Sequence, residues 1–434
     1  MKRSAGITAL ILSTITLFSG CSLGLNDPAL LSPPKITGRE AELENLISQT
    51  ADGSYKLKYP LSGEFRSAII TEDLDSDNKD EAIAFYRTDE NITNMLVMYD
   101  TGGEWKISKN FEIKFTDVDC VRFADYDFDG VEEIFTGFTN SNDSACELNI
   151  YNYTPKGHKC EKTAFKTEYS SFTTGDYDRD GGSEILTLTL DSSENDASAV
   201  LFDYNKNKLY ALDSCDMDTG VTKFENISSG LINKDTMGVV VDGLLENGYN
   251  SQIIYYNNSK RSLLNYPVST DKKGNSTVRS DKIYSADIDR DGYIEIPVVD
   301  SSVSKAKSES ETVAPVINWS SLNTKNNKLS VKVKCVSNFE FGYYFKLPES
   351  FSETTVTTLS ENNRTMKIYS KKSNTADELI ASFKIFDVGT ASDEMSGYST
   401  LESYNQYIYT YKIESNPPIS ISGETLKENF ALNE

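Results

Sequence analysis

The stretch from Asp176 to Leu190, DYDRDGGSEILTLTL, is the most informative part of this 434-residue chain. It opens with three aspartates at alternate positions, passes through two glycines, and reaches Glu184 at its ninth position. After Glu184, threonine and leucine alternate, which is typical of a β-strand. The stretch therefore predicts a tight acidic loop that leads directly into a strand.

The same pattern, called a cassette below, occurs four times in the sequence. Carboxylates occupy positions one, three, five and nine, and position six needs a sharp turn, for which glycine is best suited and for which Asn78 stands in the first copy. The candidate ligands, including the residues whose backbone carbonyls lie at position seven, are Asp73, Asp75, Asp77, Lys79 and Glu81; Asp125, Asp127, Asp129, Val131 and Glu133; Asp176, Asp178, Asp180, Gly182 and Glu184; and Asp287, Asp289, Asp291, Tyr293 and Glu295.

Oxygen ligands at this spacing suit Ca²⁺, and without a cation the clustered carboxylates would repel one another. Acidic turns without a metal are the alternative, because Asp and Gly are common in turns, but four copies of one spacing favour metal sites. An EF-hand begins in the same way, yet it ends with a chelating glutamate at position twelve that leads into a helix. Position twelve here holds Ala84, Thr136, Thr187 or Val298. We therefore expect up to four structural Ca²⁺ ions in loops between strands.

The spacing of the cassettes predicts the architecture. They begin at 73, 125, 176 and 287, so two steps of 52 and 51 residues are followed by one of 111, and a metal-free repeat is expected around Gly230 to Val241. A period near fifty residues with strand-sized segments favours a β-propeller whose blades pack against one another. The second repeat shows four expected strands, at Cys120 to Ala124, Glu133 to Phe138, Glu147 to Tyr153 and Lys159 to Lys166.

The motif Asp-x-Asp-x-Asp-Gly-x-x-Glu-Ile resembles the FG-GAP or VCBS repeats of integrin-α-type β-propellers over residues 67 to 338. The resemblance implies a calcium loop between the first two strands of each blade. It also leaves differences: Asn78 replaces glycine, the repeat near 230 lacks ligands, and five repeats are counted where integrins have seven blades. The segment Tyr55 to Leu61, within the predicted region 39 to 66, could add a closing strand.

The N-terminus resembles a bacterial lipoprotein signal. Lys2 and Arg3 precede an apolar run that ends in Phe18-Ser19-Gly20-Cys21. This predicts a signal peptide at 1 to 20, a lipid anchor on Cys21 at the extracytoplasmic face of the cell membrane, and an extended spacer at 21 to 38 with three prolines. A transmembrane helix is the alternative, but the apolar run is too short to span a bilayer. A short amphipathic helix from Arg39 to Ser48 should pack against the propeller.

A small α+β domain is expected at 339 to 434, because the cassettes end and the pattern changes. Strands are predicted at Thr365 to Tyr369, Leu379 to Val388 and Tyr407 to Ile413, and a capped helix at Ser422 to Phe430. One or two further degenerate blades are the alternative.

The amino-acid composition excludes some classes of function. The formal charge is −23 and no basic cluster stands out, which disfavours a nucleic-acid role. Beyond Cys21, five cysteines leave an odd count, so free thiols are at least as expected as a Cys146–Cys160 disulfide.

We therefore expect a non-enzymatic, lipid-anchored calcium-binding propeller that presents a binding, adhesion or assembly surface to an extracellular protein or glycan. A polysaccharide lyase or hydrolase on the same scaffold is the alternative. Catalysis by a histidine would depend on His158, the only one in the chain, which is expected at the surface in a turn. Tyrosines and phenylalanines are abundant enough for sugar-stacking platforms, but strand cores explain them equally well.

Overall fold

The structure, a computed structural model, describes residues 38–140, 145–191, 196–206, 208–266, 277–300, 311–351, 355–370 and 377–432. The predicted signal peptide, Cys21 and most of the spacer lie outside these residues. Neither helix of the described part is long and apolar enough to cross a membrane. The predicted mainly β fold is confirmed, since six antiparallel sheets account for most of the described chain.

The first sheet follows the first helix. Its elements are α1 (Arg39–Ala51), β1 (Tyr55–Leu57), β2 (Ile69–Glu72), β3 (Glu81–Thr88), β4 (Thr93–Asp100) and β5 (Trp105–Ile113). β1 and β2 lie end to end along one edge of β3, with Tyr55 opposite Thr88 and Ile69 opposite Ala84. The segment considered as a closing strand therefore belongs to the first sheet itself.

The second, third and fourth sheets are four-stranded meanders in chain order. Their strands are β6 (Asp117–Ala124), β7 (Glu133–Thr139), β8 (Cys146–Thr154) and β9 (Lys159–Tyr169); β10 (Ser171–Gly175), β11 (Glu184–Asp191), β12 (Asp196–Asn205) and β13 (Lys208–Asp216); β14 (Lys223–Asn233), β15 (Thr236–Leu245), β16 (Gly248–Asn257) and β17 (Ser262–Tyr266). All four strands predicted for the second repeat are present, and the cassette-free repeat forms a complete sheet.

The strands of the fifth and sixth sheets alternate along the chain, so neither sheet is built from one continuous segment. The fifth contains β18 (Ile296–Val299), β20 (Val316–Asn323), β21 (Lys328–Asn338), β22 (Tyr343–Lys346) and β28 (Phe430–Leu432). The sixth contains β19 (Thr312–Val313), β23 (Thr355–Ser360), β24 (Thr365–Ser370), β25 (Glu378–Asp387), β26 (Ser399–Tyr404) and β27 (Tyr407–Ile413). A 3-10 turn (Glu349–Phe351) and α2 (Gly423–Asn429) complete the chain. The strands and final helix predicted beyond residue 338 are observed, but β19 and β28 cross between the two regions.

Alternating residues in each strand bury the two faces of a sheet against different neighbours. In β3, Ile83 and Phe85 face the second sheet, whereas Ala82, Ala84 and Tyr86 face α1. The same division continues along the chain: separate hydrophobic clusters join the second sheet to the third, the third to the fourth and the fourth to the fifth. A single sheet could not bury both faces, and this explains why the repeats must stack.

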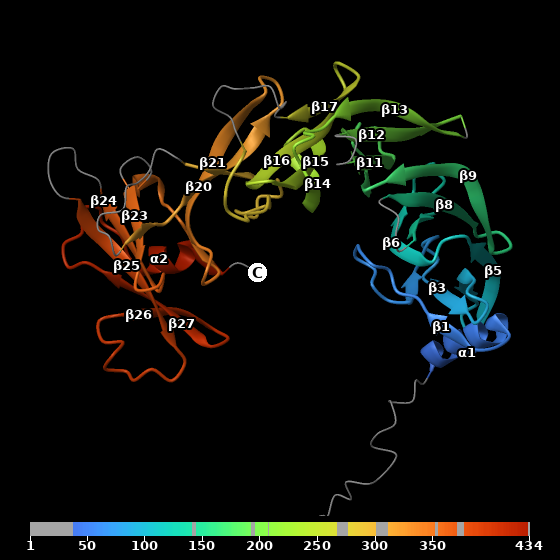
Figure 1. The fold of residues 1–434 in the computed structure, drawn as a ribbon, viewed down its shortest axis with the longest axis horizontal. Helices are drawn as coiled ribbons and strands as arrows, with labels where there is room; N and C mark the ends of the chain where they lie inside the picture. Colours follow the sequence, from blue (N-terminus) through green and yellow to red (C-terminus); the bar gives the residue numbers. More distant parts are fainter. Residues whose placement is uncertain are drawn as a thin grey trace, which may run out of the picture.

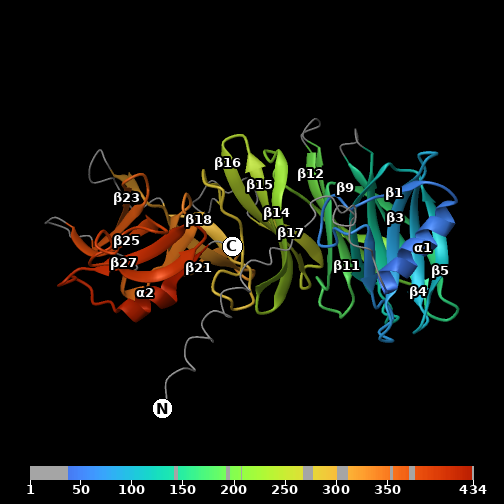
Figure 2. The ribbon, with the colours of Figure 1, turned by 90° about the horizontal axis from the view of Figure 1, so that it is seen from below.

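The stacked sheets form an arc. Figure 1 shows this arc running from α1 and the first sheet to the sixth sheet, and Figure 2 shows the same order from below. Leu43 and Ile47 of α1 are buried against the outer face of the first sheet. The helix thus packs as predicted and caps the first end of the stack. Among the described strands, none pairs the first sheet with the fifth, so ring closure stays a prediction.

The described cysteines are free thiols. Cys146 lies opposite Tyr169, whereas Cys160 lies opposite Tyr153, so the two cysteines sit at opposite ends of the β8–β9 pair. The Cys146–Cys160 disulfide, which the sequence left as one of two alternatives, does not form because the two cysteines lie too far apart along the strand pair.

Candidate metal centres

Each cassette brings its carboxylates together at one end of a sheet. In the third, Asp176, Asp178, Asp180 and Glu184 have ligand oxygens within 4.8 Å of one another. The fourth cassette does the same with all its predicted side chains, namely Asp287, Asp289, Asp291 and Glu295. The first two bring together three each: Asp73, Asp75 and Glu81, and Asp125, Asp127 and Glu133. Four loops could therefore hold metal ions.

The fifth-position aspartates of the first two cassettes lie outside these groups in the described structure. The first of them, Asp77, is bound by Lys79, whose Nζ donates to its Oδ2 at 2.7 Å. The second, Asp129, accepts a hydrogen bond at 2.9 Å from the backbone N–H of Val131. These two aspartates would have to join the cluster to complete the predicted ligand sets.

The first aspartate of the cassette organises the turn. Asn78 N donates to Asp73 Oδ2 at 2.9 Å, Gly130 N to Asp125 Oδ2 at 3.0 Å, and Gly292 N to Asp287 Oδ2 at 2.9 Å. The position-six residues have φ between 65° and 103°, which confirms that this site needs glycine or asparagine. The carbonyls expected as ligands at position seven, on Lys79, Val131, Gly182 and Tyr293, stay a prediction.

Position four also has positive φ in every cassette, which the sequence did not reveal. Ser76, Phe128, Arg179 and Arg290 have φ of 57°, 65°, 65° and 64°. Left-handed backbone is unfavourable for such side chains, so the surrounding loop must impose it. No glycine stands at this position, so the left-handed backbone there could not be predicted from the residue types.

The ninth-position glutamates are the buried members of the clusters. The exposed fractions of Glu81, Glu133, Glu184 and Glu295 do not exceed 3%. Burial is the main cause that raises the pKa of Glu133 and Glu184 to about 8 and that of Glu81 and Glu295 to about 7. Neighbouring aspartates raise them further. Burial disfavours the charged form of these carboxyl groups in the absence of a counter-ion, and a bound cation would stabilise that charged form.

Several oxygens in these clusters are buried without a hydrogen-bond partner, namely Asp127 Oδ1, Asp176 Oδ1 and Glu295 Oε1. A buried oxygen without a partner costs free energy, and a bound cation would satisfy it. The set of hard oxygens therefore fits an oxygen-preferring divalent ion. Position twelve lies in β3, β7, β11 and β18, so the chain continues as a strand and not as the helix of an EF-hand.

His158 is not a free surface residue as the sequence suggested. Its ring stacks on Tyr99 with centroids 3.9 Å apart, and its Nδ1 lies 2.9 Å from the hydroxyl of Tyr153. That hydroxyl also bonds the carboxylate of Glu81. The turn after β8 therefore braces the first cluster, a role that sequence spacing could not show because the contact crosses between sheets.

Neighbouring cassettes touch one another. Glu132 N donates to the carbonyl of Leu74 at 2.8 Å, and Ile294 N donates to that of Leu231 at 2.8 Å in the cassette-free repeat. The ring of Phe128 lies against Gly182, where a Cβ would be only 1.9 Å from Cζ of that ring. The loops therefore link successive sheets in addition to capping their own strands.

We expect Gly182→Ala to destabilise the protein by about 1 kcal/mol or less, because its methyl group would displace the half-exposed ring of Phe128. In a Phe128→Ala background the same change should cost much less. Urea unfolding of the two single variants and the double variant measures this coupling. Equal costs in both backgrounds would show that the ring and the glycine do not constrain each other.

The metal-free protein should lose stability as the pH rises. The four glutamates have pKa values near 7 to 8 when folded, above their ordinary value of about 4.3, so the folded state binds more protons between these limits. We expect a higher melting temperature in chelator at about pH 5.5 than at about pH 8.5. Glu133→Gln, which imitates the protonated form, should reduce this difference. A melting temperature that rises from pH 5.5 to pH 8.5 would contradict the raised pKa values of the four buried glutamates.

Comparisons with known proteins are limited. No protein-family profile and no curated protein matches the chain. Among solved structures, it is similar to a functionally unknown protein from Desulfotomaculum acetoxidans, with 14% identity, TM-score 0.31, and coverage of 74% of this chain and 85% of the other. It is also similar to the exotype rhamnogalacturonan lyase YesX, with 12% identity, TM-score 0.30, and coverage of 77% and 73%. The Dos1 propeller gives 10% identity, TM-score 0.30, and coverage of 83% and 84%.

Proposed function

We propose that this protein is a calcium-stabilised, lipid-anchored surface protein that binds a protein or glycan outside the cell and has no enzymatic activity. The observation that supports it best is the set of four carboxylate clusters, each with a buried glutamate, at the loop ends of stacked sheets. Structural calcium of this kind suits a compartment where the free ion is plentiful. Extracellular calcium modules bind with dissociation constants of about 0.1 to 1 mM.

Calcium would act on the chain's own residues in two ways. It would neutralise the aspartates of each loop. It would also bind both the first aspartate, which follows one strand, and the ninth-position glutamate, which begins the next, and so hold the two ends of the loop together. Because adjacent loops contact each other through Leu74, Phe128 and their partners, fixing one loop also fixes the junction between sheets. The result is a rigid face of loops and turns suited to binding.

The binding role is tested by affinity capture from intact cells with the calcium-loaded protein from residue 22 onward. A partner retained in calcium and lost in chelator is expected. Failure to enrich any protein or glycan would contradict the binding role. Release of reducing or unsaturated sugar from polysaccharides would contradict the absence of enzymatic activity.

Cys21→Ala should abolish lipid labelling and release the protein from the membrane, because the thiol is the proposed acyl acceptor. Metabolic labelling with a fatty-acid analogue, followed by fractionation, measures this. Cys120→Ala is the matched control, since Cys120 is a buried thiol of the second sheet. Persistent labelling of the Cys21 variant would contradict the anchor.

A further inference from the structure

A hollow of about 540 Å³ lies at the place where the fourth sheet lacks a cassette. Only Lys234 and Asp235 connect β14 to β15, whereas residues 176–183 form the corresponding loop of the third sheet. The hollow is bordered by the third cassette, by the β16–β17 turn and by the β20–β21 turn. The missing loop thus leaves a pocket between three sheets, of a size usual for small-ligand sites.

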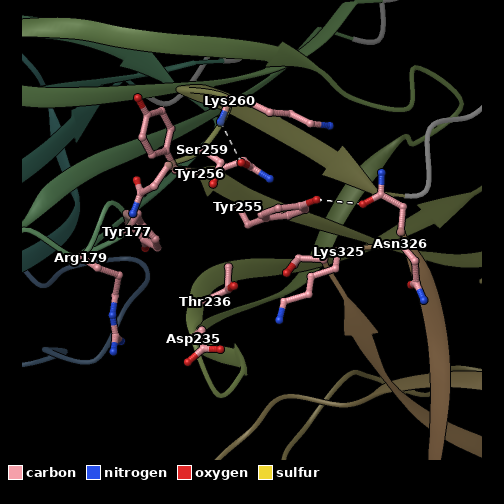
Figure 3. A pocket seen from close by; sticks show the side chains of 14 residues that line it. Tyr177, Arg179, Asp235, Thr236, Tyr255, Tyr256, Ser259, Lys260, Lys325 and Asn326 are labelled. Atoms are coloured by element: carbon pink, nitrogen blue, oxygen red, sulfur yellow. Dashed lines mark hydrogen bonds between the residues drawn. The ribbon is translucent and has the colours of Figure 1, made fainter.

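The lining is polar and cationic above a tyrosine floor. Tyr255 and Tyr256 are almost fully buried, and the Tyr255 hydroxyl donates to Asn327 Oδ1 at 3.1 Å. Four asparagines of the two turns, together with Thr236 and Ser259, supply amides and hydroxyls. Figure 3 shows Arg179 and Lys325 on opposite sides of the hollow, with Thr236 and Asp235 between them. Such a lining can donate and accept many hydrogen bonds.

The charge of the lining is unusual for this chain. Arg179, Lys260 and Lys325 face one acid, Asp235, in a protein whose formal charge is −23. None of these three cations forms an ion pair with another residue in the ranges that the structure describes. Outside the lining, the nearby acids include Asp178 of the third cassette, whose backbone carbonyl accepts a hydrogen bond from Asn258 Nδ2 at 2.6 Å. They also include Asp203 and Asp213 of the third sheet, which act electrostatically on Tyr256 as Asp178 does. Calcium in the third cassette, as in the proposed function, would neutralise Asp178. Asp203 accepts a hydrogen bond from the Tyr210 hydroxyl and Asp213 accepts one from the backbone N–H of Leu263, and the lining itself carries three cations to one acid.

We propose that this pocket binds an acidic saccharide, that is, a sugar chain that carries carboxylate or phosphate groups. This inference rests on the proposed binding function and assigns its ligand class. Hydroxyl-rich sugars match the amides and hydroxyls of the lining, and an anionic group matches the cations. A protein partner would need an exposed apolar anchor, whereas the tyrosine rings here are buried as a floor.

Isothermal titration of the calcium-loaded protein tests the proposal with three probes: an oligogalacturonate, a glycerol phosphate oligomer and a neutral galactose oligomer. At least one anionic probe should bind about tenfold or more tightly than the neutral one, and binding should weaken with added salt. Binding of the carboxylated or of the phosphorylated probe identifies the source of the anionic group. Equal binding of all three, or binding of none, would overturn the proposal.

Charge reversal locates the site. Lys260→Glu with Lys325→Glu should weaken binding about tenfold or more, because both cations border the hollow. Lys56→Glu with Lys109→Glu is the control, with the same change in net charge on exposed strand residues of the first sheet, outside the lining. Ser259→Trp should block the pocket without altering charge. Binding that is unaffected by the first pair and by Ser259→Trp would overturn the assignment.

The binding function and the assignment of the pocket can be contradicted separately. If an acidic saccharide binds but ignores these variants, the binding function holds and the pocket assignment fails. If no saccharide binds while a protein partner is captured from cells, the ligand class fails and the binding function holds. Melting curves with and without calcium show that each variant is folded before it is titrated.

Discussion

Chelation of calcium is expected to lower the melting temperature by many degrees. Binding to the folded state alone stabilises it by RT ln(1 + [L]/Kd), about 1.4 kcal/mol per site at ten times Kd, so four sites in one cooperative unit would contribute about 5 to 6 kcal/mol. Removal of the ions also leaves buried glutamates beside aspartates in each loop. Calorimetric melting in about 10 mM calcium, at least ten times the expected Kd, and in excess chelator measures the effect.

The double change Asp125→Ala with Asp129→Ala should reproduce part of this loss. It removes the first-position aspartate, which bonds the turn through Gly130 N, and the fifth-position carboxylate of the same loop. The remaining response to calcium should be smaller than that of the unmodified protein. Asp235→Ala is the matched control, because it removes an exposed aspartate from the turn of the cassette-free repeat.

Two results would contradict the structural role of calcium. One is a melting curve that does not change under chelation. The other is a double variant that keeps the full response to calcium, since the second loop would then contribute nothing. Magnesium serves as the chemical control, because it prefers a smaller and more regular octahedral site than these loops offer.

Asp242→Ala should destabilise the protein by about 3–5 kcal/mol, because it leaves a buried guanidinium without its partner. The Arg279 and Asp242 side chains are both fully buried, and Arg279 Nη2 donates to Asp242 Oδ1 at 2.9 Å. Arg279 also donates to Ser251 Oγ at 2.9 Å, and Ser285 N donates to Asp242 Oδ2 at 2.8 Å. The network fixes the segment that leads from the fourth sheet to the fourth cassette.

Urea unfolding followed by tyrosine and tryptophan fluorescence measures this loss. Glu104→Ala, which breaks the exposed pair with Lys106, is the control and should change stability by at most about 1 kcal/mol. Replacement of both buried partners, Asp242→Leu with Arg279→Met, should cost less than Asp242→Ala alone. If Asp242→Ala were as stable as Glu104→Ala, the buried Arg279–Asp242 pair would not contribute to stability as expected.

The sequence predicted the loops and strands of this fold well because each cassette is a local signal. Aspartates at alternate positions, the turn residue at position six and the apolar run after Glu133 or Glu184 all act within one loop and its strand. The observed strands of the second repeat differ from the predicted ones only at their ends. The spacing also located the cassette-free repeat, which forms the fourth sheet.

Contacts between distant segments could not be predicted in this way. The pairing of β1 with β3, the return of β28 to the fifth sheet and the support of Glu81 by Tyr153 all depend on contacts between segments far apart in the sequence. The Arg279–Asp242 pair joins residues that no motif relates. The hollow beside Tyr255 likewise arises from what the fourth repeat lacks, and its lining comes from three sheets.

A crystal structure of the protein crystallised in excess calcium, with anomalous scattering to locate the ions, would show directly whether the four loops bind metal. We expect an ion in each of the loops 73–81, 125–133, 176–184 and 287–295, bound by the aspartates and the buried glutamate, and none in the turn between β14 and β15. Loops that hold no ion under these conditions would contradict this expectation.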